Sequence, residues 1–393
     1  MWRINIVTML FFMLVQVVVP LIPRYALEVG AEPFIIGIAV SSISVAAILL
    51  RPFSGIASDK WSRSKLMLLG MAFGVAAYGV LYAFGGINAV IVSRLLEGIG
   101  VALFVPSSMA SAVDMAPEGK VGQALGWRSL MVGIGFSVGP ALGSVLSESF
   151  GYRPTFGIAA GLICLLIPLA VFREARRVTR DKGVSFEGLR ERNFLLATSS
   201  LVVYAVAWMG LLTFLSAYLK ILGYGDIEIG LFVSIQAAAS LVLRILAGRV
   251  SDSHPATMTW SGLLVISLSF LLIWLNQVPP FLYFSAVIFG IGVGIFVPGS
   301  QTMALARSPP QSRGLLASIH TMGVDVGNLI GPILFGAVIQ STGSYVASFA
   351  MAPVIALAAG LIVLVPSAMG RRAKPGAEPG SGPGSEPAPE AKR

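Results

Sequence analysis

Charged residues are scarce in this 393-residue chain, and cysteine is almost absent. Asp, Glu, Lys and Arg together make up 11% of the sequence, against about 25% in ordinary soluble domains. Hydrophobic residues make up 56%. A water-soluble core needs far less apolar sequence than this. The composition therefore excludes an ordinary soluble domain and indicates that lipid is the main solvent.

Motifs for catalysis and for cofactor binding are also missing. The single cysteine, Cys164, lies within an apolar run, so the chain has no intramolecular disulfide and no cysteine metal site. The sequence contains no Walker loop, dinucleotide-binding glycine motif, nucleophile elbow or metal-ligand cluster. We therefore expect no enzyme activity, no catalytic residues, no metal, no other cofactor and no bound nucleotide.

Long apolar runs dominate what is present. A helix that spans the bilayer needs about 20 apolar residues, whereas a β-barrel would need short alternating strands. Twelve runs meet the helix requirement, near residues 4–26, 33–56, 64–83, 88–112, 122–148, 152–172, 193–219, 227–249, 257–276, 280–305, 313–339 and 345–367. The first lacks a small-residue cleavage site and is too long for a signal peptide, so we expect it to remain as the first helix. The sequence predicts an all-α membrane protein with 12 transmembrane helices.

The net charge of +9 is distributed unevenly along the chain. When both termini are placed in the cytoplasm, most Lys and Arg fall in cytoplasmic segments, and only Arg24, Arg153 and Lys220 fall outside. This asymmetry follows the positive-inside rule. The excess of basic residues is therefore explained by the orientation of the chain in the membrane, and we expect no nucleic-acid partner. It predicts a multi-pass protein of the cell (plasma) inner membrane, surrounded by the lipid bilayer.

The second half of the chain repeats the first. The stretch around Arg51, Gly55 and Asp59 recurs, with less charge, as Arg244, Gly248 and Asp252. The run that begins at Gly98 recurs at Gly290, but there no counterpart of Arg94 or Glu97 accompanies it. Repeated membrane halves are typical of transporters. We expect an N-terminal six-helix bundle at 1–172, a cytoplasmic linker at 173–192, a C-terminal six-helix bundle at 193–367 and a cytoplasmic tail at 368–393. The Pro, Gly and Glu content of the tail predicts disorder.

Three motifs resemble signatures of the major facilitator superfamily. The first is the loop signature between helices 2 and 3, although Ser62 replaces its second glycine. The second is an arginine followed by glycines in helix 4. The third, found in the antiporter branch, is a glycine-rich stretch of helix 5 in which Ser144 replaces the last glycine. Their residues are Gly55, Asp59, Lys60, Arg63 and Lys65; Arg94, Gly98 and Gly100; and Gly135, Gly139, Pro140 and Gly143.

The resemblance implies the major facilitator fold, with two pseudo-symmetric six-helix bundles around a central cavity. It implies a secondary active transporter that works by alternating access, most similar to the drug:proton antiporters, with protons and a small lipophilic solute as its partners. We expect it to act as a monomer. Two alternatives stay open: uptake or facilitated diffusion of a small metabolite such as a sugar or an organic acid, and a membrane sensor that moves no solute. Helix 1 lacks the acidic residue that many drug antiporters carry.

Three charged residues inside predicted helices are candidates for proton coupling. Arg94 and Glu97 are three residues apart, so they share one helix face and we expect them to pair. Asp325 lies near the middle of helix 11, where a carboxylate is by default a functional hypothesis. A fixed ion pair at Arg94, or a pairing of Asp325 with a distant arginine, would instead be structural.

Polar and aromatic side chains in the middle of other helices are candidates for the wall of a substrate cavity. Packing between helices explains each of them as well, because a buried amide or ring also fits against a neighbouring helix. The candidates are Phe12 and Gln16 in helix 1, Tyr204 and Trp208 in helix 7, Gln236 in helix 8 and Gln301 in helix 10.

The repeated loop motif predicts a gate between the two bundles. Asp59 can accept hydrogen bonds from the exposed amides at the start of helix 11, near Arg313. We assign Gly55, Lys60, Arg63, Lys65, Asp252 and Arg128 to the same gate. For the basic residues, a purely topogenic role explains the charge equally well. His320 aligns with Arg128 across the repeat.

Glycines at a four-residue spacing mark helices 5 and 11. This spacing lets two helix backbones approach closely, and a Gly-Pro pair can bend a helix. Close packing alone explains both helices as well as an antiporter role does. The residues are Gly135, Gly139, Pro140 and Gly143 in helix 5 and Gly327, Gly331 and Pro332 in helix 11.

Overall fold

The structure is a computed structural model that describes residues 2–60, 62–116, 121–171, 188–251, 253–306 and 313–372. Throughout these ranges the regular elements are helices, and twelve helical stretches are long and apolar enough to cross a membrane. The prediction of an all-α protein with 12 transmembrane helices is confirmed.

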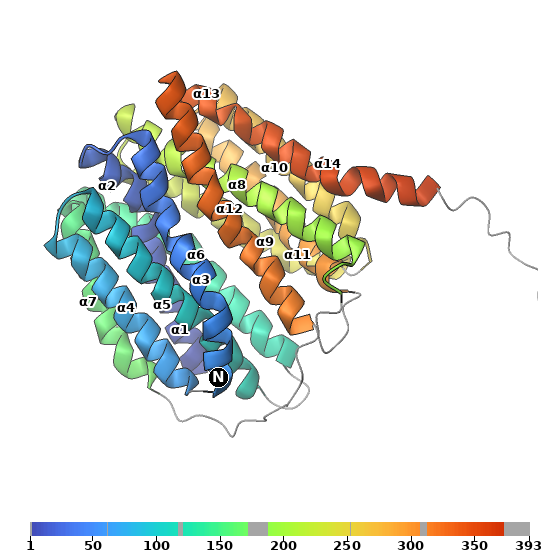
Figure 1. Ribbon diagram of the computed structural model, residues 1–393. Coiled ribbons are helices and arrows are strands. Elements are labelled where there is room, and N and C mark those ends of the chain that lie inside the picture. The colour runs from blue at the N-terminus through green and yellow to red at the C-terminus, as the bar shows by residue number, and fades with distance from the viewer. Residues whose placement is uncertain are drawn as a thin grey trace, which may run out of the picture.

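Residues 2–170 form the first half, drawn from blue to green on the left of Figure 1. The first span changes from α-helix to a 3₁₀ turn at Val19–Leu21, because Pro20 has no N–H for the helical ladder. The helices of this half are α1 (Trp2–Val18), α2 (Ile22–Glu28), α3 (Pro33–Lys60), α4 (Arg63–Ala83), α5 (Ile87–Asp114), α6 (Val121–Phe150) and α7 (Tyr152–Ala170).

Residues 192–372 form the second half, which lies on the right of Figure 1. Its last span is divided, since the short α13 precedes the long final helix. The helices are α8 (Arg192–Ile221), α9 (Asp226–Ser251), α10 (Pro255–Leu275), α11 (Phe281–Leu305), α12 (Arg313–Thr342), α13 (Tyr345–Phe349) and α14 (Met351–Arg372).

The stretch that the sequence suggested as a loop between helices 2 and 3 is mostly helix. Helix α3 continues to Lys60, beyond the predicted end at 56, and α4 begins at Arg63. The side chain of Ser62 accepts a hydrogen bond from the N–H of Lys65 at 3.3 Å and so caps α4. Asp252, most of the predicted linker and residues 373–393 lie outside the described residues.

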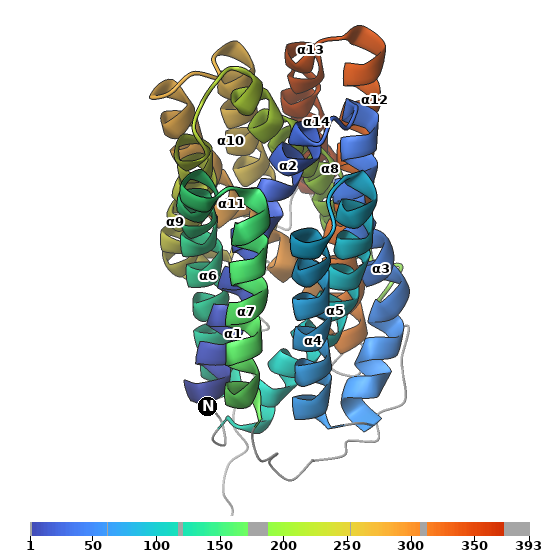
Figure 2. The ribbon, with the colours of Figure 1, turned by 90° about the vertical axis from the view of Figure 1, so that its left-hand side faces the viewer.

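The helices run between two ends of the molecule (Figure 2). We call the end that carries the N-terminus the N-terminal face, which the charge pattern predicts to be cytoplasmic, and the opposite end the far face. Short turns join helices at the far face. Glycines with positive φ make these turns possible, because other residues rarely adopt this backbone conformation; they include Gly30, Gly86, Gly151, Gly223 and Gly343.

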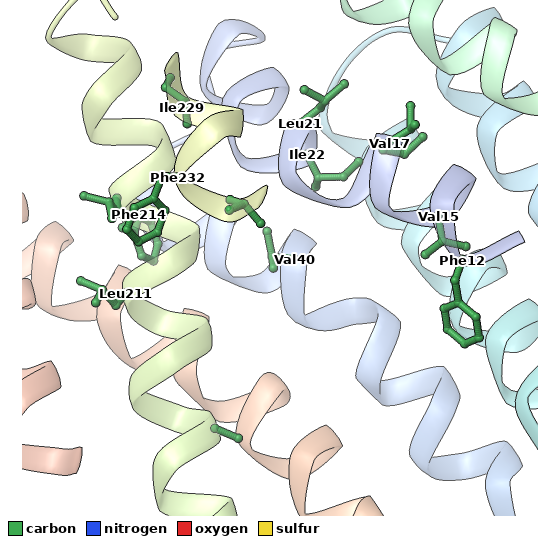
Figure 3. Packing of buried hydrophobic residues seen from close by; sticks show 14 of the residues in the cluster. Phe12, Val15, Val17, Leu21, Ile22, Val40, Leu211, Phe214, Ile229 and Phe232 are labelled. Carbon is green, nitrogen blue, oxygen red and sulfur yellow. The ribbon is translucent and has the colours of Figure 1, made fainter. Parts of the chain in front are cut away.

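The two halves meet along two pairs of helices, α3 with α12 and α6 with α9. At Gly37 an added Cβ would collide with the carbonyl of Pro332, and at Gly230 with Ser144, so both contacts bring helices close together. The apolar core continues across the boundary. Figure 3 shows buried side chains of α1 and α3 in the same cluster as those of α8 and α9, among them Val15, Val40, Phe214 and Phe232.

Within each half, the spaced glycines lie against a neighbouring backbone. In the first half, Gly139 of α6 faces Met13 of α1, and Gly135 and Gly143 contact the same helix. In the second half, Gly327 and Gly331 of α12 lie against α8. The repeat therefore preserves this packing, with α6 against α1 and α12 against α8.

Gly139→Leu is expected to destabilise the protein by about 1–3 kcal/mol, the usual cost of overpacking. A Cβ at this position would lie 2.6 Å from both the Met13 carbonyl oxygen and the Gln16 Cβ. Thermal unfolding of the purified protein in detergent measures the effect. Gly126→Leu in the same helix is the control, because a Cβ there meets nothing within 4 Å. Equal melting temperatures for the two variants would contradict this account of the α1–α6 contact.

Candidate functional site

A cavity of about 410 Å³ lies between the two halves. Helix α6 of the first half forms one wall, and α8, α9, α11 and α12 of the second half form the others. Arg128, Arg244 and His320 each lie about two helical turns from the end of their helix at the N-terminal face. Trp208, by contrast, lies near the middle of α8. The cavity therefore extends from the N-terminal side toward the centre of the molecule.

Four of the six residues predicted for the cavity wall line it: Tyr204, Trp208, Gln236 and Gln301. Rings from the second half support the two aromatic side chains. Trp208 stacks on Phe289 with ring centroids 4.2 Å apart, and Tyr204 lies 4.9 Å from Phe296. These contacts hold the aromatic wall in place.

Phe12 and Gln16 are absent from the described lining of the cavity. Both are buried in the first half. Gln16 lies against Gly139, while Phe12 lies 5.8 Å from Phe136, ring centroid to centroid. Phe136 does line the cavity, so Phe12 supports the wall from behind.

Arg128 and His320, which align across the repeat, line this one cavity. Arg128 Nη2 donates to Ser108 Oγ at 2.8 Å and to the Val105 carbonyl at 3.3 Å, both on α5. His320 Nδ1 lies 3.1 Å from Thr198 Oγ1, and its Nε2 lies 3.4 Å from Ser300 Oγ. The structure therefore places Arg128 at the cavity, where it bonds within its own half.

A buried ionic network joins the halves at the far face. The carboxylate of Asp226, at the start of α9, lies 3.0 Å from Arg24 Nη1 and 3.1 Å from Lys220 Nζ. It also accepts hydrogen bonds from Ser147 Oγ at 2.7 Å and from Tyr152 Oη at 3.0 Å. The Arg24 side chain is 0% exposed. Arg24, Ser147 and Tyr152 come from the first half, so this network closes the molecule above the cavity.

Sequence reasoning did not identify the far-face network. A signal was nevertheless present, since Arg24 and Lys220 were two of only three basic residues assigned to the outer side. Basic residues that break the positive-inside rule need a local reason. Here both contact Asp226, which the sequence analysis had not singled out.

A second ion pair joins the halves deeper inside the molecule, on the N-terminal side of its middle. Arg51 of α3 contacts Asp325 of α12 through two atom pairs: Nε lies 2.7 Å from Oδ2, and Nη2 donates to Oδ1 at 3.0 Å. Their side chains are 23% and 12% exposed, so this pair is more accessible than the Arg24–Asp226 pair of the far-face network. The sequence left open that Asp325 pairs with a distant arginine, and the structure shows this pairing.

The other residues of the predicted gate contribute less to the described contacts. Arg63 forms an ion pair with Asp114 of its own half, and Lys65 is exposed. For Gly55, Asp59 and Lys60 the structure describes only the helical backbone, and Asp252 lies outside the described residues. The proposed contact between Asp59 and the start of α12 therefore stays a prediction.

Arg94 and Glu97 form an ion pair inside the first half, with Arg94 Nη1 2.5 Å from Glu97 Oε2. Tyr78 of α4 donates to Glu97 Oε1 at 3.2 Å. Arg94 and Glu97 are 1% and 2% exposed, so the pair is sealed between helices and does not appear in the described cavity lining. Asp325, in the other half, is held by Arg51 rather than by this pair.

Proteins with similar sequences include several that are named for drug resistance. The multi-drug resistance efflux pump PmrA of Streptococcus pneumoniae is 26% identical over 355 residues, covering 86% of this chain and 88% of its own length. The multidrug resistance protein MdtG of Proteus mirabilis is 28% identical, with coverage of 85% and 87%. The quinolone resistance protein NorA of Staphylococcus aureus is 22% identical, with coverage of 91% and 93%.

Solved structures with the same fold include a bacterial homolog of the human lysosomal transporter Spinster in an inward-facing and occupied conformation. It has a TM-score of 0.76 and 16% sequence identity, covering 95% of each chain. The nucleoside transporter NupG also has a TM-score of 0.76, at 15% identity. The profile of the Major Facilitator Superfamily matches residues 4–260 and 196–391. With this match across nearly the whole chain, the protein belongs to the Major Facilitator Superfamily and is a membrane transporter, not an enzyme.

Proposed function

We propose that this transporter exports small lipophilic solutes in exchange for protons. The observation that carries the proposal is a largely apolar cavity between the halves, with an ionic contact between the halves toward each end of the molecule. The drug-resistance names of PmrA, MdtG and NorA support the class of solute. The aromatic side chains of Tyr204 and Trp208 in the cavity wall suit a lipophilic solute. A sugar would need more hydroxyl and amide groups in the wall as hydrogen-bond partners.

The two ionic contacts suit alternating access, in which a central site opens to one side at a time. The Asp226 network holds the far face closed above the cavity. Opening that side requires the network to separate, while the Arg51–Asp325 pair would hold the N-terminal side together. We place the N-terminal face and both termini in the cytoplasm of the cell, in the inner membrane, and we expect a monomer to suffice.

Two carboxylates are positioned to carry the proton. Protonation of Glu97 would weaken its contact with Arg94 and change the packing of α4 against α5, through Tyr78. Protonation of Asp325 would release Arg51 and loosen the contact between the halves directly. The two sites lie in different halves, so each can be tested by itself.

Transport by the purified protein in proteoliposomes tests this function. We expect a pH gradient to drive accumulation of lipophilic solutes, and addition of such a solute to move protons in the opposite direction. Collapse of the gradient with an ionophore is the control, and it should leave only equilibration. Solute movement that ignores the gradient would refute proton exchange. Binding without any movement, for all solutes of a broad panel, would instead indicate a membrane sensor.

A further inference from the structure

We propose that the cavity is a binding site for a lipophilic anion, whose negative group is held by Arg244 and Arg128. This inference rests on the proposed function, because it names the class of solute that the transporter carries. Both arginines line the cavity, from the adjoining helices α9 and α6. Among the described lining residues there is no Asp or Glu to balance them.

Arg244 is the central observation. Its side chain is exposed to the cavity, and within the described part of the chain its guanidinium forms neither an ion pair nor a hydrogen bond. Tyr204 lines the same cavity. A guanidinium stays positively charged in proteins and offers five N–H donors, so an open arginine in a cavity presents an unfilled site for an anion.

The internal repeat shows why Arg244 lacks a partner. Its counterpart in the first half, Arg51, is paired with Asp325. The position in α6 that corresponds to Asp325 is Gly133, which lies against Leu241 of α9. The two contacts between the halves, α3 with α12 and α9 with α6, therefore correspond across the repeat, but in the second the carboxylate is missing and the arginine lines the cavity.

Arg128 adds a second positive charge to the same cavity. Its hydrogen-bond partners, Ser108 Oγ and the Val105 carbonyl, are neutral, so they orient the guanidinium without cancelling its charge. Two cations that line one cavity repel each other, and an anion bound in that cavity relieves the repulsion. Charge-assisted hydrogen bonds from guanidinium groups favour planar acids, such as carboxylates.

The rest of the cavity determines the body of the solute. Phe136, Trp208 and Val297 supply an apolar and aromatic surface, and Gln236 adds one amide. A volume of about 410 Å³ accommodates a small aromatic molecule but leaves little room for a large one. The chemistry of the site therefore fits an aromatic acid: a flat apolar body with one negatively charged group.

Equilibrium binding to the full-length protein in detergent, measured by titration calorimetry, tests the site. The probes share one apolar body and differ in charge: 1-naphthylacetate, 2-(1-naphthyl)ethanol and 2-(1-naphthyl)ethylammonium. We expect the acid to bind about tenfold more tightly than the alcohol, because it gains charge-assisted hydrogen bonds, and the ammonium to bind most weakly. Equal affinities, tighter binding of the ammonium, or no binding of the acid would overturn the proposal.

Variants at Arg244 test whether this residue causes the preference for the acid over the alcohol. We expect Arg244→Gln to weaken binding of the acid about tenfold and to change binding of the alcohol less than about twofold. Arg244→Lys keeps the positive charge but not the planar pair of donors, so it should weaken binding of the acid less than Arg244→Gln does. Arg190→Gln is the matched control, because it removes one exposed arginine outside the cavity. An unchanged preference for the acid in Arg244→Gln would refute the role of this residue. If that variant does not fold, the ranking of the three probes on the unaltered protein still decides the proposal.

Flux measurements separate this inference from the function on which it rests. Transport of the alcohol or of the ammonium, without preference for the acid, would leave the proposed function standing and overturn the anion site. Selective binding of the acid that depends on Arg244, with no transport of any probe, would support the anion site and refute the proposed function.

Discussion

Asp226→Asn is expected to open the far face and to stop directional transport. The substitution removes the charge that faces Arg24 and Lys220, and Arg24 would remain buried without a counter-ion. Breaking one partner of a buried pair in this way costs about 3–5 kcal/mol. A cost of this size is enough to favour a state in which Arg24 reaches water, so the closed far face would no longer dominate.

Cysteine labelling measures the opening. Val233→Cys, introduced together with Cys164→Ser, places a thiol at a buried position in α9, seven residues below Asp226. We expect an impermeant maleimide to label it at least about tenfold faster in the Asp226→Asn background. Glu228→Gln is the control, because Glu228 is exposed in the same turn and accepts a hydrogen bond from Gly225 N–H. Labelling at the rate of the control would show that the network does not hold the far face closed.

Glu97→Gln should abolish accumulation driven by a pH gradient while preserving exchange of solute. The amide keeps the shape of the side chain and can still bond to Tyr78, but it cannot take up and release a proton. Under a gradient of one pH unit, exchange of one proton per neutral solute supports at most about tenfold accumulation, and we expect this ratio to fall to about one in the variant.

Comparison of two carboxylate variants assigns the coupling site. Asp325→Asn should reduce accumulation less than Glu97→Gln, and it should also loosen the N-terminal side because Arg51 loses its partner. Glu191→Gln, which removes a carboxylate at the start of α8, is the control. If the two variants and their combination all retain gradient-driven accumulation, neither Glu97 nor Asp325 couples protons to transport, and facilitated diffusion becomes the better account.

The sequence predicts features that depend on local spacing. Apolar runs set the number of spans, and Arg94 and Glu97 meet because three residues bring them to one side of one helix. Arg24 and Asp226 meet across the two halves, and so do Arg51 and Asp325. No local pattern indicates either pair, because the relative placement of the halves brings these side chains together.

The direction in which each helix turns its side chains explains why four of the six predicted wall residues line the cavity and two do not. Tyr204 and Trp208 are four residues apart on α8, so one correct orientation places both at the cavity. Gln16 and Phe12 lie on α1, which packs by its glycine-facing side against α6. Polarity in the middle of a helix marks a side chain that avoids lipid, but it does not distinguish a cavity from a neighbouring helix.

The short glycine turns at the far face also bear on how the protein is made. In the proposed orientation these turns are the parts that must cross the bilayer during synthesis, and Gly86, Gly151 and Gly223 each lie in a tight connection between two long helices. Moving so little polar chain through the hydrocarbon layer costs far less than moving a folded domain. The nascent chain can therefore enter the membrane as successive pairs of helices, and contacts between distant spans, such as α1 with α6 and α8 with α12, form only after both have been inserted.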